Sequence, residues 1–528
     1  MARRPPAPLG LRLTSVVIGA AFALPGGYVL WRAITLGSDA GEVADEVVEP
    51  LWRTVQLGTL VAIGAALLGT SLAWLLVRTD VPLRRLWAVL MPLPLVFPSF
   101  VGAAAFIAGL APDGLLRDLL EMVGYDAPRR FRGMGAAWLV LTLFTYPYVF
   151  LPVAARLSML HPSLEESARM LGDSPLRAFR RVVLPQIRGA ILAGTLLVFL
   201  YTLSDFGAVQ LLGFDTLTRV IFATRLADRA VSFGAALVLL MLAVVVVVVE
   251  RRIRGAHTVD TRVSDRPPRT TPLGAWRIPA LIGILGVVML ALVVPIASLS
   301  QWAWRGLERG DRVGSLSDQL GELTGPAWTS AWLSVVAAVA AVAAVLPVAM
   351  MVTRYRSRLS APVNAAVVGG FAVPGLVIAL SLVFWSLNAP GFEFVYETVP
   401  LLIMAYVVHF GSQAMRAAEV AVSAVPDRLR ESSRLLGASP LRRLTTIDLP
   451  LMRPGLLAGG GLVLLSTVKE LPATLLLAPT DVETLTIRVW KTFDEGYYAE
   501  AGLASLALVL VSGLLTWGLV LRRSDHLA

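Results

Sequence analysis

The sequence contains no cysteine among its 528 residues, and charged residues make up only 16% of them. The absence of cysteine excludes disulfide bonds, thiolate metal sites and a cysteine nucleophile, and it leaves the redox compartment undecided. Histidine is also scarce, and the four histidines are not spaced as a metal site: His161, His257, His409 and His526. We expect them to be structural or solvated, and we assign no catalytic residue and no firm metal ligand.

Hydrophobic residues, in contrast, make up 56% of the chain, and the mean hydropathy is +0.72. They form runs of roughly 18 to 25 residues, the length of a helix that crosses a bilayer. The runs do not alternate as the strands of a membrane β-barrel do. The net charge of +10 comes from arginines between the runs, which fits orientation in a membrane better than nucleic-acid binding. The composition predicts an all-α polytopic protein in the lipid bilayer.

About twelve membrane spans are predicted, in two sets of six. Arginines in the short segments 78–85 and 354–358 place that side in the cytoplasm, and an even number of spans places both termini there. The start of the chain, 1–36, fits a first membrane helix better than a cleaved signal peptide. The expected spans are 13–36, 54–77, 87–110, 136–157, 188–211, 233–250, 278–303, 328–353, 361–387, 397–416, 453–476 and 500–521.

The segment 251–277 separates the two sets of spans. It holds seven arginines, the pair Pro267-Pro268 and several Ser and Thr residues, which are typical of a flexible linker. We therefore expect a first unit at 1–250, a cytoplasmic linker at 251–277 and a second, homologous unit at 278–528. A pseudo-two-fold axis is expected to relate the two units.

A polar loop occurs in both units at a constant offset of 265 residues. Glu166-Ser-Ala-Arg-Met-Leu-Gly172 is matched by Glu431-Ser-Ser-Arg-Leu-Leu-Gly437, and Leu-Pro closes both copies. We name these segments the first repeated loop (160–186) and the second repeated loop (425–451). A surface that is built twice indicates two copies of a partner, or a two-fold symmetric partner.

Local signals predict that each repeated loop is a helix, a tight glycine turn and a second helix. Gly172 and Gly437 suit the left-handed position that ends a helix. Ser-Pro then offers a new N-cap followed by proline at the first helical position. The first helix is expected to start at a capping box, Ser163 with Glu166, and in the second unit Asp427 is the expected cap. An alternative is that Glu166 only caps and the glycines only turn the chain.

The spacing of the loop resembles the signature of permease subunits of ATP-binding-cassette importers, the binding-protein-dependent transport inner-membrane components. The matching residues are Glu166, Ala168, Gly172, Leu184 and Pro185, and then Glu431, Ser433, Gly437, Leu449 and Pro450, with Ser433 in place of an alanine. In that family the loop is the coupling helix that docks on an ATPase. The resemblance implies two copies of a cytoplasmic ATPase, an extracytoplasmic substrate-binding protein and a bacterial cytoplasmic (inner) membrane.

No ATP-binding motif of the form G-x-x-x-x-G-K-[ST] occurs in the chain. The resemblance therefore implies that this chain is a transporter subunit without an enzyme activity or a cofactor of its own. ATP would be bound and hydrolysed on the partner subunits.

Two acidic residues, Asp205 and Glu470, lie in the fifth and eleventh expected spans, again 265 residues apart. Ionisable groups inside a span are costly and usually face a partner or an aqueous path. One interpretation is that both line a cation route near the pseudo-two-fold axis. The other is that each lies at the outer interface, or that Glu470 neutralises the neighbouring Lys469.

The residues around these carboxylates indicate the substrate. Ser-Asp-Phe-Gly-Ala-Val-Gln at 204–210 and Lys-Glu-Leu-Pro-Ala-Thr at 469–474 resemble fused ferric-iron permeases, which implies iron(III) as cargo. Thiamine permeases share the fused layout, and polyamine, sulfate and phosphonate permeases share the loop, so they stay as alternatives. A secondary transporter of the major facilitator type also has twelve spans, but it does not explain the repeated loops. Segments 111–135 and 304–325 are expected to face the binding protein.

Overall fold

The computed structural model describes residues 6–36, 40–126, 130–160, 162–255, 270–309 and 316–519. Within these ranges every regular element is helical, apart from two isolated β-bridges. Nine of the described helices are long and apolar enough to cross a membrane, and eleven spans result if each of two bent helix pairs counts as one. The prediction of an all-α polytopic membrane protein is confirmed.

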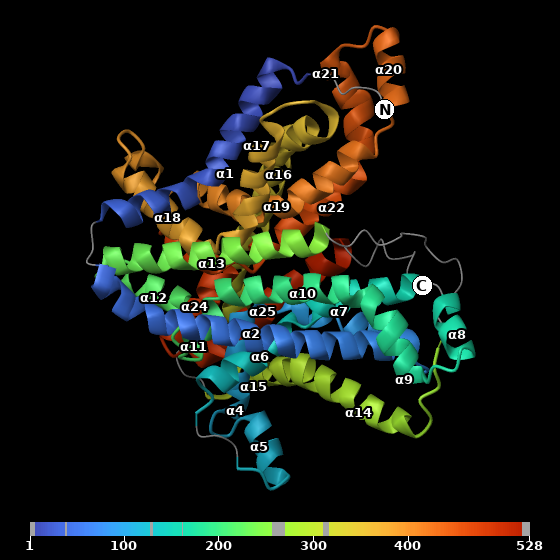
Figure 1. The fold of residues 1–528 in the computed structure, drawn as a ribbon. Helices are drawn as coiled ribbons and strands as arrows, with labels where there is room; N and C mark the ends of the chain where they lie inside the picture. The colour runs from blue at the N-terminus through green and yellow to red at the C-terminus, as the bar shows by residue number, and fades with distance from the viewer. Residues whose placement is uncertain are drawn as a thin grey trace.

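The first unit forms most of the lower part of the molecule in Figure 1, where it is coloured blue to green. Its helices are α1 (Leu9–Thr35), α2 (Ala40–Arg78), α3 (Arg84–Leu90), η1 (Leu93–Val96), α4 (Ser99–Leu110), α5 (Leu115–Met122), α6 (Met134–Thr145), α7 (Pro147–Met159), α8 (Pro162–Met170), α9 (Pro175–Ala178), η2 (Phe179–Val183), α10 (Leu184–Ser204), α11 (Gly207–Leu211), α12 (Leu217–Thr224) and α13 (Arg229–Gly255).

The second unit has a similar order of elements, with the single helix α19 in the place of α6 and α7 (Figure 1). Its helices are η3 (Gly274–Trp276), α14 (Arg277–Val288), η4 (Met289–Val293), α15 (Val294–Arg309), α16 (Leu316–Arg354), α17 (Ser360–Gly369), η5 (Gly370–Ala372), α18 (Gly375–Asn388), η6 (Glu393–Val395), α19 (Val399–Ser423), α20 (Asp427–Leu435), α21 (Pro440–Arg443), η7 (Leu444–Asp448), α22 (Leu449–Val468), α23 (Pro472–Leu477), α24 (Leu485–Asp494) and α25 (Tyr498–Leu519).

Four of the expected spans are not straight helices. The third and ninth bend by 98° and 110°, at Phe97-Pro98 and Val373-Pro374. Proline lacks an N–H and disfavours the helical conformation of the residue before it, which explains both bends. The fifth and eleventh spans, predicted at 188–211 and 453–476, break after Ser204 and Val468. The prediction of one continuous helix is wrong in both places.

The tenth expected span corresponds to α19, which is not among the eleven apolar spans. It carries the polar residues His409 and Gln413 within its length. His409 Nδ1 lies 3.2 Å from the carbonyl oxygen of Val373, and Gln413 Oε1 accepts a hydrogen bond from Ser466 at 3.1 Å. Since α19 packs between α16 and α22, protein groups rather than lipid surround these side chains.

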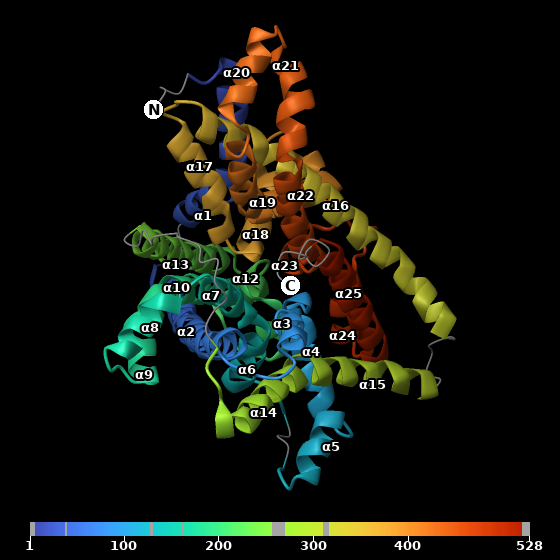
Figure 2. The ribbon, with the colours of Figure 1, turned by 90° about the vertical axis from the view of Figure 1, so that its right-hand side faces the viewer.

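The first helix of each unit packs against the other unit. α1 contacts α16, α17 and α18 of the second unit, and α15 contacts α4 and α5 of the first, an exchange that Figure 2 shows from the side. The segments before these helices are exchanged too, because Pro6 pairs with Arg356 and Thr271 pairs with Thr79 in the two β-bridges.

The structure describes both ends of the expected linker 251–277. α13 continues to Gly255, and the backbone N–H of Thr271 donates to the carbonyl of Arg78 at 2.8 Å. The N–H of Leu273 also donates to Asp80 Oδ1 at 2.8 Å. Both ends of the segment are therefore held, while residues 256–269 lie outside the described residues.

Two equivalent glycines, Gly194 and Gly459, allow the spans after the repeated loops to pack closely. A Cβ atom at Gly194 of α10 would lie 2.7 Å from the carbonyl oxygen of Tyr148 in α7. A Cβ atom at Gly459 of α22 would lie 2.7 Å from Ala417 Cβ in α19. Small residues at such contacts let the helix backbones approach each other.

We expect Gly194→Ala to lower the stability of the folded chain by about 1–3 kcal/mol, because the added methyl group meets backbone atoms that must move. The thermal midpoint of the purified full-length chain in detergent measures this loss. Gly189→Ala is the matched control in the same helix, because a Cβ atom there meets nothing within 4 Å. An unchanged midpoint for Gly194→Ala would contradict the packing role.

Candidate functional site

The first repeated loop folds as α8, a turn at Gly172 and α9, which continues into η2. Gly172 has φ +92°, and the next residue, Asp173, donates its backbone N–H to the carbonyl of Ala168 at 3.1 Å. This is the hydrogen bond that closes a helix at a left-handed glycine. The helix–turn–helix prediction is confirmed here, but α8 begins at Pro162, so Ser163 is already a helical residue and not the predicted N-cap.

The second repeated loop has the same shape, with α20, a turn at Gly437 and α21; both helices are labelled in Figure 1. Gly437 has φ +76°, and the N–H of Ala438 donates to the carbonyl of Ser433 at 3.0 Å. Ser439 is the predicted N-cap of the next helix, since its hydroxyl accepts the N–H of Arg442 at 3.2 Å.

Asp427 does not cap α20 as predicted. Pro426 occupies the N-cap position, and Asp427 is the first helical residue, where its carboxylate pairs with Arg430 at 3.2 Å. The error has a simple reason. Pro426, whose ring fixes φ near −65°, has the extended conformation of a cap, with φ −64° and ψ 134°, so the cap position lies one residue earlier than predicted.

The Leu-Pro pair that closes each repeated loop follows a π-helical turn. η2 directly precedes Leu184-Pro185, and η7 directly precedes Leu449-Pro450. A proline ring inside a helix clashes with the carbonyl four residues earlier, and a wider turn relieves that clash. The loop helix therefore continues into α10 or α22 without a flexible joint.

Each repeated loop exposes two large apolar residues just before its glycine. Met170 and Leu171 are 89% and 88% exposed, and Leu435 and Leu436 are 89% and 87% exposed. The side chains of Glu166 and Glu431 are exposed beside them. Exposed apolar side chains that are framed by polar ones are typical of a protein-docking surface. An exposed apolar pair therefore occurs at the same place in both units, Met-Leu in the first and Leu-Leu in the second.

Asp205 lies at the break between α10 and α11. Its Oδ1 accepts the backbone N–H groups of Ala208 at 3.1 Å and Val209 at 3.4 Å, and its Oδ2 accepts the hydroxyl of Ser99. The side chain is buried. Asp205 therefore caps the first turn of α11 and joins it to the start of α4.

Glu470 caps α23 in the same way. Its carboxylate accepts the N–H of Ala473 at 2.9 Å and the N–H of Thr474 at 3.0 Å. Gly375 takes the place that Ser99 has in the first unit, because each follows the proline of a bend. A Cβ atom at Gly375 would lie 2.8 Å from Glu470 Oε1, so the glycine makes room for the longer acid.

Lys469 turns away from Glu470. Its Nζ donates to the carbonyl of Leu95 at 2.7 Å, at the bend in the first unit. Among the ion pairs of the described residues, none joins Lys469 to Glu470. Direct neutralisation of one by the other is therefore not what the structure shows. Sequence adjacency could not reveal this contact, since 374 residues separate Lys469 from Leu95.

The two broken spans meet at the boundary between the units. A Cβ atom at Gly207 would lie 3.1 Å from Leu471 Cδ2, and Leu471 corresponds to Phe206 at the offset of 265. The ring of Phe206 lies 4.6 Å from Phe222 in its own unit and 5.5 Å from Trp490 in the other. Sequence analysis missed this apolar contact, because the breaks that bring the rings together were not predicted.

Within the described residues, no group of three or more His, Asp or Glu side chains could hold a metal ion. His409 is part-buried beside the carbonyl oxygen of Val373, while His161, His257 and His526 lie outside the described residues. Asp205 and Glu470 each use their oxygens for backbone N–H groups. The geometry supports capping by these carboxylates and gives no coordination site.

We expect Gly375→Ser to destabilise the chain, because its side chain displaces Glu470 from the helix terminus that it caps, and a lost cap costs about 0.5–2 kcal/mol. Combining it with Glu470→Asp rebuilds the Ser99–Asp205 arrangement of the first unit and should recover most of the loss. Thermal midpoints of the two variants in detergent measure this. A double variant that is less stable than Gly375→Ser would refute the proposed complementarity.

Comparison with known proteins adds relatives of stated function. The chain is 32% identical to the Fe(3+)-transport system permease protein FbpB 2 of Haemophilus influenzae, over 97% of this chain and 98% of the relative. It is 33% identical to the sulfate permease CysT of Salmonella typhimurium over 27% of this chain and 50% of the relative. It is 32% identical to the putrescine permease PotI of Escherichia coli over 34% of this chain and 62% of the relative.

The family model for the binding-protein-dependent transport system inner membrane component matches two segments, 59–254 and 343–522. These segments make up well over half of the chain, and each contains one repeated loop with the spans on both sides of it. The match, the helical architecture and the paired loops lead to one assignment. The chain belongs to the family of binding-protein-dependent transport system inner membrane components, as a fused permease of an ATP-binding-cassette importer.

Proposed function

We propose that this chain forms the complete membrane channel of the importer and that two copies of one cytoplasmic ATPase dock on its repeated loops. The observation that carries this proposal is the exposed apolar pair before each glycine, Met170-Leu171 and Leu435-Leu436, which are equally exposed in both units. Two equivalent apolar pairs can each insert into the same apolar pocket on one of two copies of a partner. ATP is hydrolysed on those partners, and this chain contributes no enzyme activity.

The proposed mechanism uses the repeated loops as coupling loops. Nucleotide binding draws the two ATPases together and moves the loops that are seated on them. Because each loop helix continues through a π-turn into α10 or α22, the movement reaches the breaks at Asp205 and Glu470. ATP shifts the channel between its outward-open and inward-open states only through contacts that differ between these states.

In this proposal the repeated loops and both termini face the cytoplasm, and the binding protein docks on the opposite face. α5 projects away from the second repeated loop in Figure 1, and the N–H of Leu115 at its start donates to Gln301 of the second unit at 3.0 Å. Segments 111–135 and 304–325, which both include residues outside the described ranges, are the proposed contact regions. The contact between α5 and α15 would transmit docking to both units.

Iron(III) is the proposed cargo. The supporting observation is that the ferric relative from Haemophilus influenzae matches nearly the whole fused chain, whereas the sulfate and putrescine relatives match about a third of it or less. Asp205 and Glu470 remain the candidate pathway residues. We propose that they act by holding the two breaks in place, so that Phe206 and Leu471 close the route between the units.

We expect Gly172→Pro and Gly437→Pro to abolish coupling while the chain still inserts, because proline has φ near −65° and cannot adopt the φ of +92° or +76° found there. Co-purification of the ATPase and uptake per ATP hydrolysed measure the effect. Gly496→Pro is the matched control, since Gly496 has φ +83° outside the repeated loops and should keep ATPase association. Full coupling in both loop variants would exclude the docking role.

Cargo identity is tested in proteoliposomes that hold the complex, its ATPase and its own binding protein. Labelled iron(III), sulfate, putrescine and thiamine are supplied in turn. We expect ATP-dependent uptake of iron alone, because the match to the ferric permease covers both units. Uptake of another substrate in place of iron would replace the proposed cargo and leave the assignment as a permease unchanged.

A further inference from the structure

Each unit has one arginine at the end of its second span, directly beneath its repeated loop. Arg78 ends α2, and Arg354 ends α16. An offset of 276 residues relates these two arginines, and the same offset relates Thr54 to Ser330. That correspondence is structural as well, because Thr54 accepts the N–H of Leu217 at 2.9 Å and Ser330 accepts the N–H of Leu485 at 2.8 Å.

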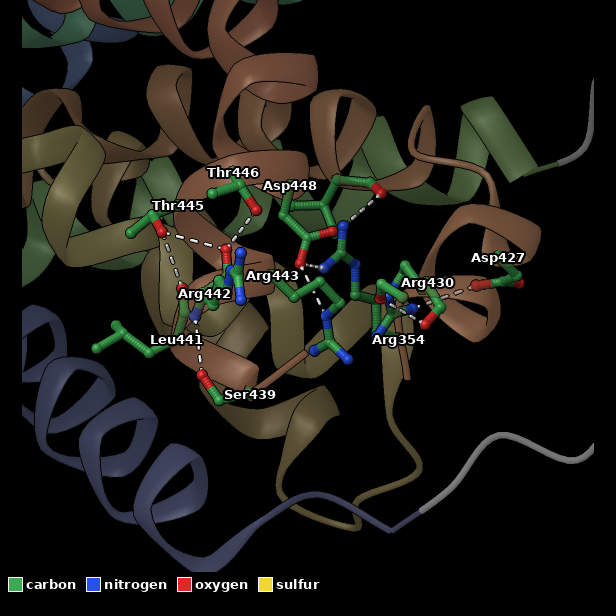
Figure 3. A network of polar contacts seen from close by, with 12 residues as sticks. Arg354, Asp427, Arg430, Ser439, Leu441, Arg442, Arg443, Thr445, Thr446 and Asp448 are labelled. Carbon is green, nitrogen blue, oxygen red and sulfur yellow. Dashed lines mark hydrogen bonds and ion pairs between the residues drawn. The ribbon is translucent and has the colours of Figure 1, made fainter. Parts of the chain in front are cut away.

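The two arginines have different partners. Arg78, which is 4% exposed, pairs with Glu165 of α8 at 3.4 Å, so the second span holds the first helix of the loop. Arg354, which is 5% exposed, pairs with Asp448 at 3.3 Å, and Arg443 pairs with the same carboxylate at 3.4 Å (Figure 3). Asp448 ends η7 just before α22, so this second span holds the last part of the loop.

The acid that pairs with the arginine of the second span lies at a different position of the repeat in each unit. At the offset of 265, Glu165 corresponds to Arg430, and Val183 corresponds to Asp448. Arg430 and Arg354 carry like charges and repel each other. The carboxylate that pairs with Arg430 is that of Asp427. The second unit has no acid at the position of Glu165, and it has one at the position of Val183, just before the next span. Each second span thus retains a buried ion pair to its loop, at different positions.

We propose that Arg78 and Arg354 are positioning residues through which each repeated loop moves its membrane helices, by inequivalent ion pairs in the two units. This inference rests on the proposed function. In the first unit the pair Arg78–Glu165 makes α2 follow the docking helix α8. In the second unit the pair Arg354–Asp448 makes α16 follow α22, the span that ends at the break beside Glu470.

Burial makes these pairs suited to such a role. An ion pair on the surface contributes little, but removing one partner of a buried pair leaves a charge without compensation. The side chain of Asp448 is fully buried, and that of Glu165 is 15% exposed. Loop and span must therefore move together, because separating them would leave a buried guanidinium unpaired.

The test transplants the arrangement of the second unit into the first. Glu165→Arg alone places an arginine against Arg78 and should lower the amount of substrate imported per ATP hydrolysed by about tenfold, as expected for residues of one ion-pair network. Glu165→Arg combined with Val183→Asp restores a carboxylate at the place of Asp448 and should recover coupling to within about twofold of the starting protein. Glu165→Arg with Val183→Asn, which adds no charge, should not recover it.

The assay uses the full chain reconstituted with its ATPase and binding protein, and size-exclusion chromatography verifies folding. The reciprocal variant, Arg430→Glu with Arg443→Ala and Asp448→Val, gives the second unit the residues that the first has at these three positions, leaves Arg443 no unpaired charge and should also retain coupling. Unchanged coupling in Glu165→Arg overturns the inference, and so does failure of both paired variants when each is folded and bound to ATPase. If the starting protein binds no ATPase, the proposed function fails instead, so the two failures are distinguishable.

Discussion

Lipid tails offer no hydrogen bonds, so every polar group that interrupts a membrane helix must be satisfied from within the protein. This constraint determines how the breaks of the fifth and eleventh spans are built. Each break exposes the free N–H groups of a new helix, and a carboxylate from the break itself accepts them: Asp205 for α11 and Glu470 for α23. The two breaks can then meet between the units without leaving backbone groups unpaired. The contact of Phe206 with Trp490 starts from the residue that follows Asp205, directly beside the first of these caps.

The two units solve the same problem with different residues. Where the first unit uses Ser99 and Asp205, the second uses Gly375 and Glu470, so a smaller neighbour accompanies a longer acid. Where the first unit ties its second span to α8, the second ties it to the start of α22. In the first case the cap keeps its position while the residues change, and in the second case the ion pair is kept while its position changes. Pseudo-symmetry in this chain is therefore a symmetry of contacts more than of residue types.

Much of the architecture could be predicted from local sequence signals. Long apolar runs predicted the spans, and glycine followed by Ser-Pro predicted the helix–turn–helix shape of both repeated loops, because those signals act within a few residues. The sequence analysis did not predict the bends and breaks, although Pro98 and Pro374 are present in the sequence. An apolar run shows that a segment is buried in the membrane but does not show a change of helix direction within it. Contacts between distant segments, such as Lys469 with Leu95, have no local signal at all. The roles of Asp205 and Glu470 stayed open for the same reason, since burial and the direction of each carboxylate are properties of the folded chain.

The exchange of first helices has a consequence for how such a protein can evolve. α1 covers the second unit and α15 covers the first, so neither unit presents a finished surface without the other. Two separate genes for such units would have to be expressed in equal amounts, and each product could also pair wrongly with itself. A single chain contains one copy of each unit, and the unit nearest to each is its correct partner. Each unit then contacts the other unit and not a copy of itself. A substitution in one unit has to be compatible only with the other unit.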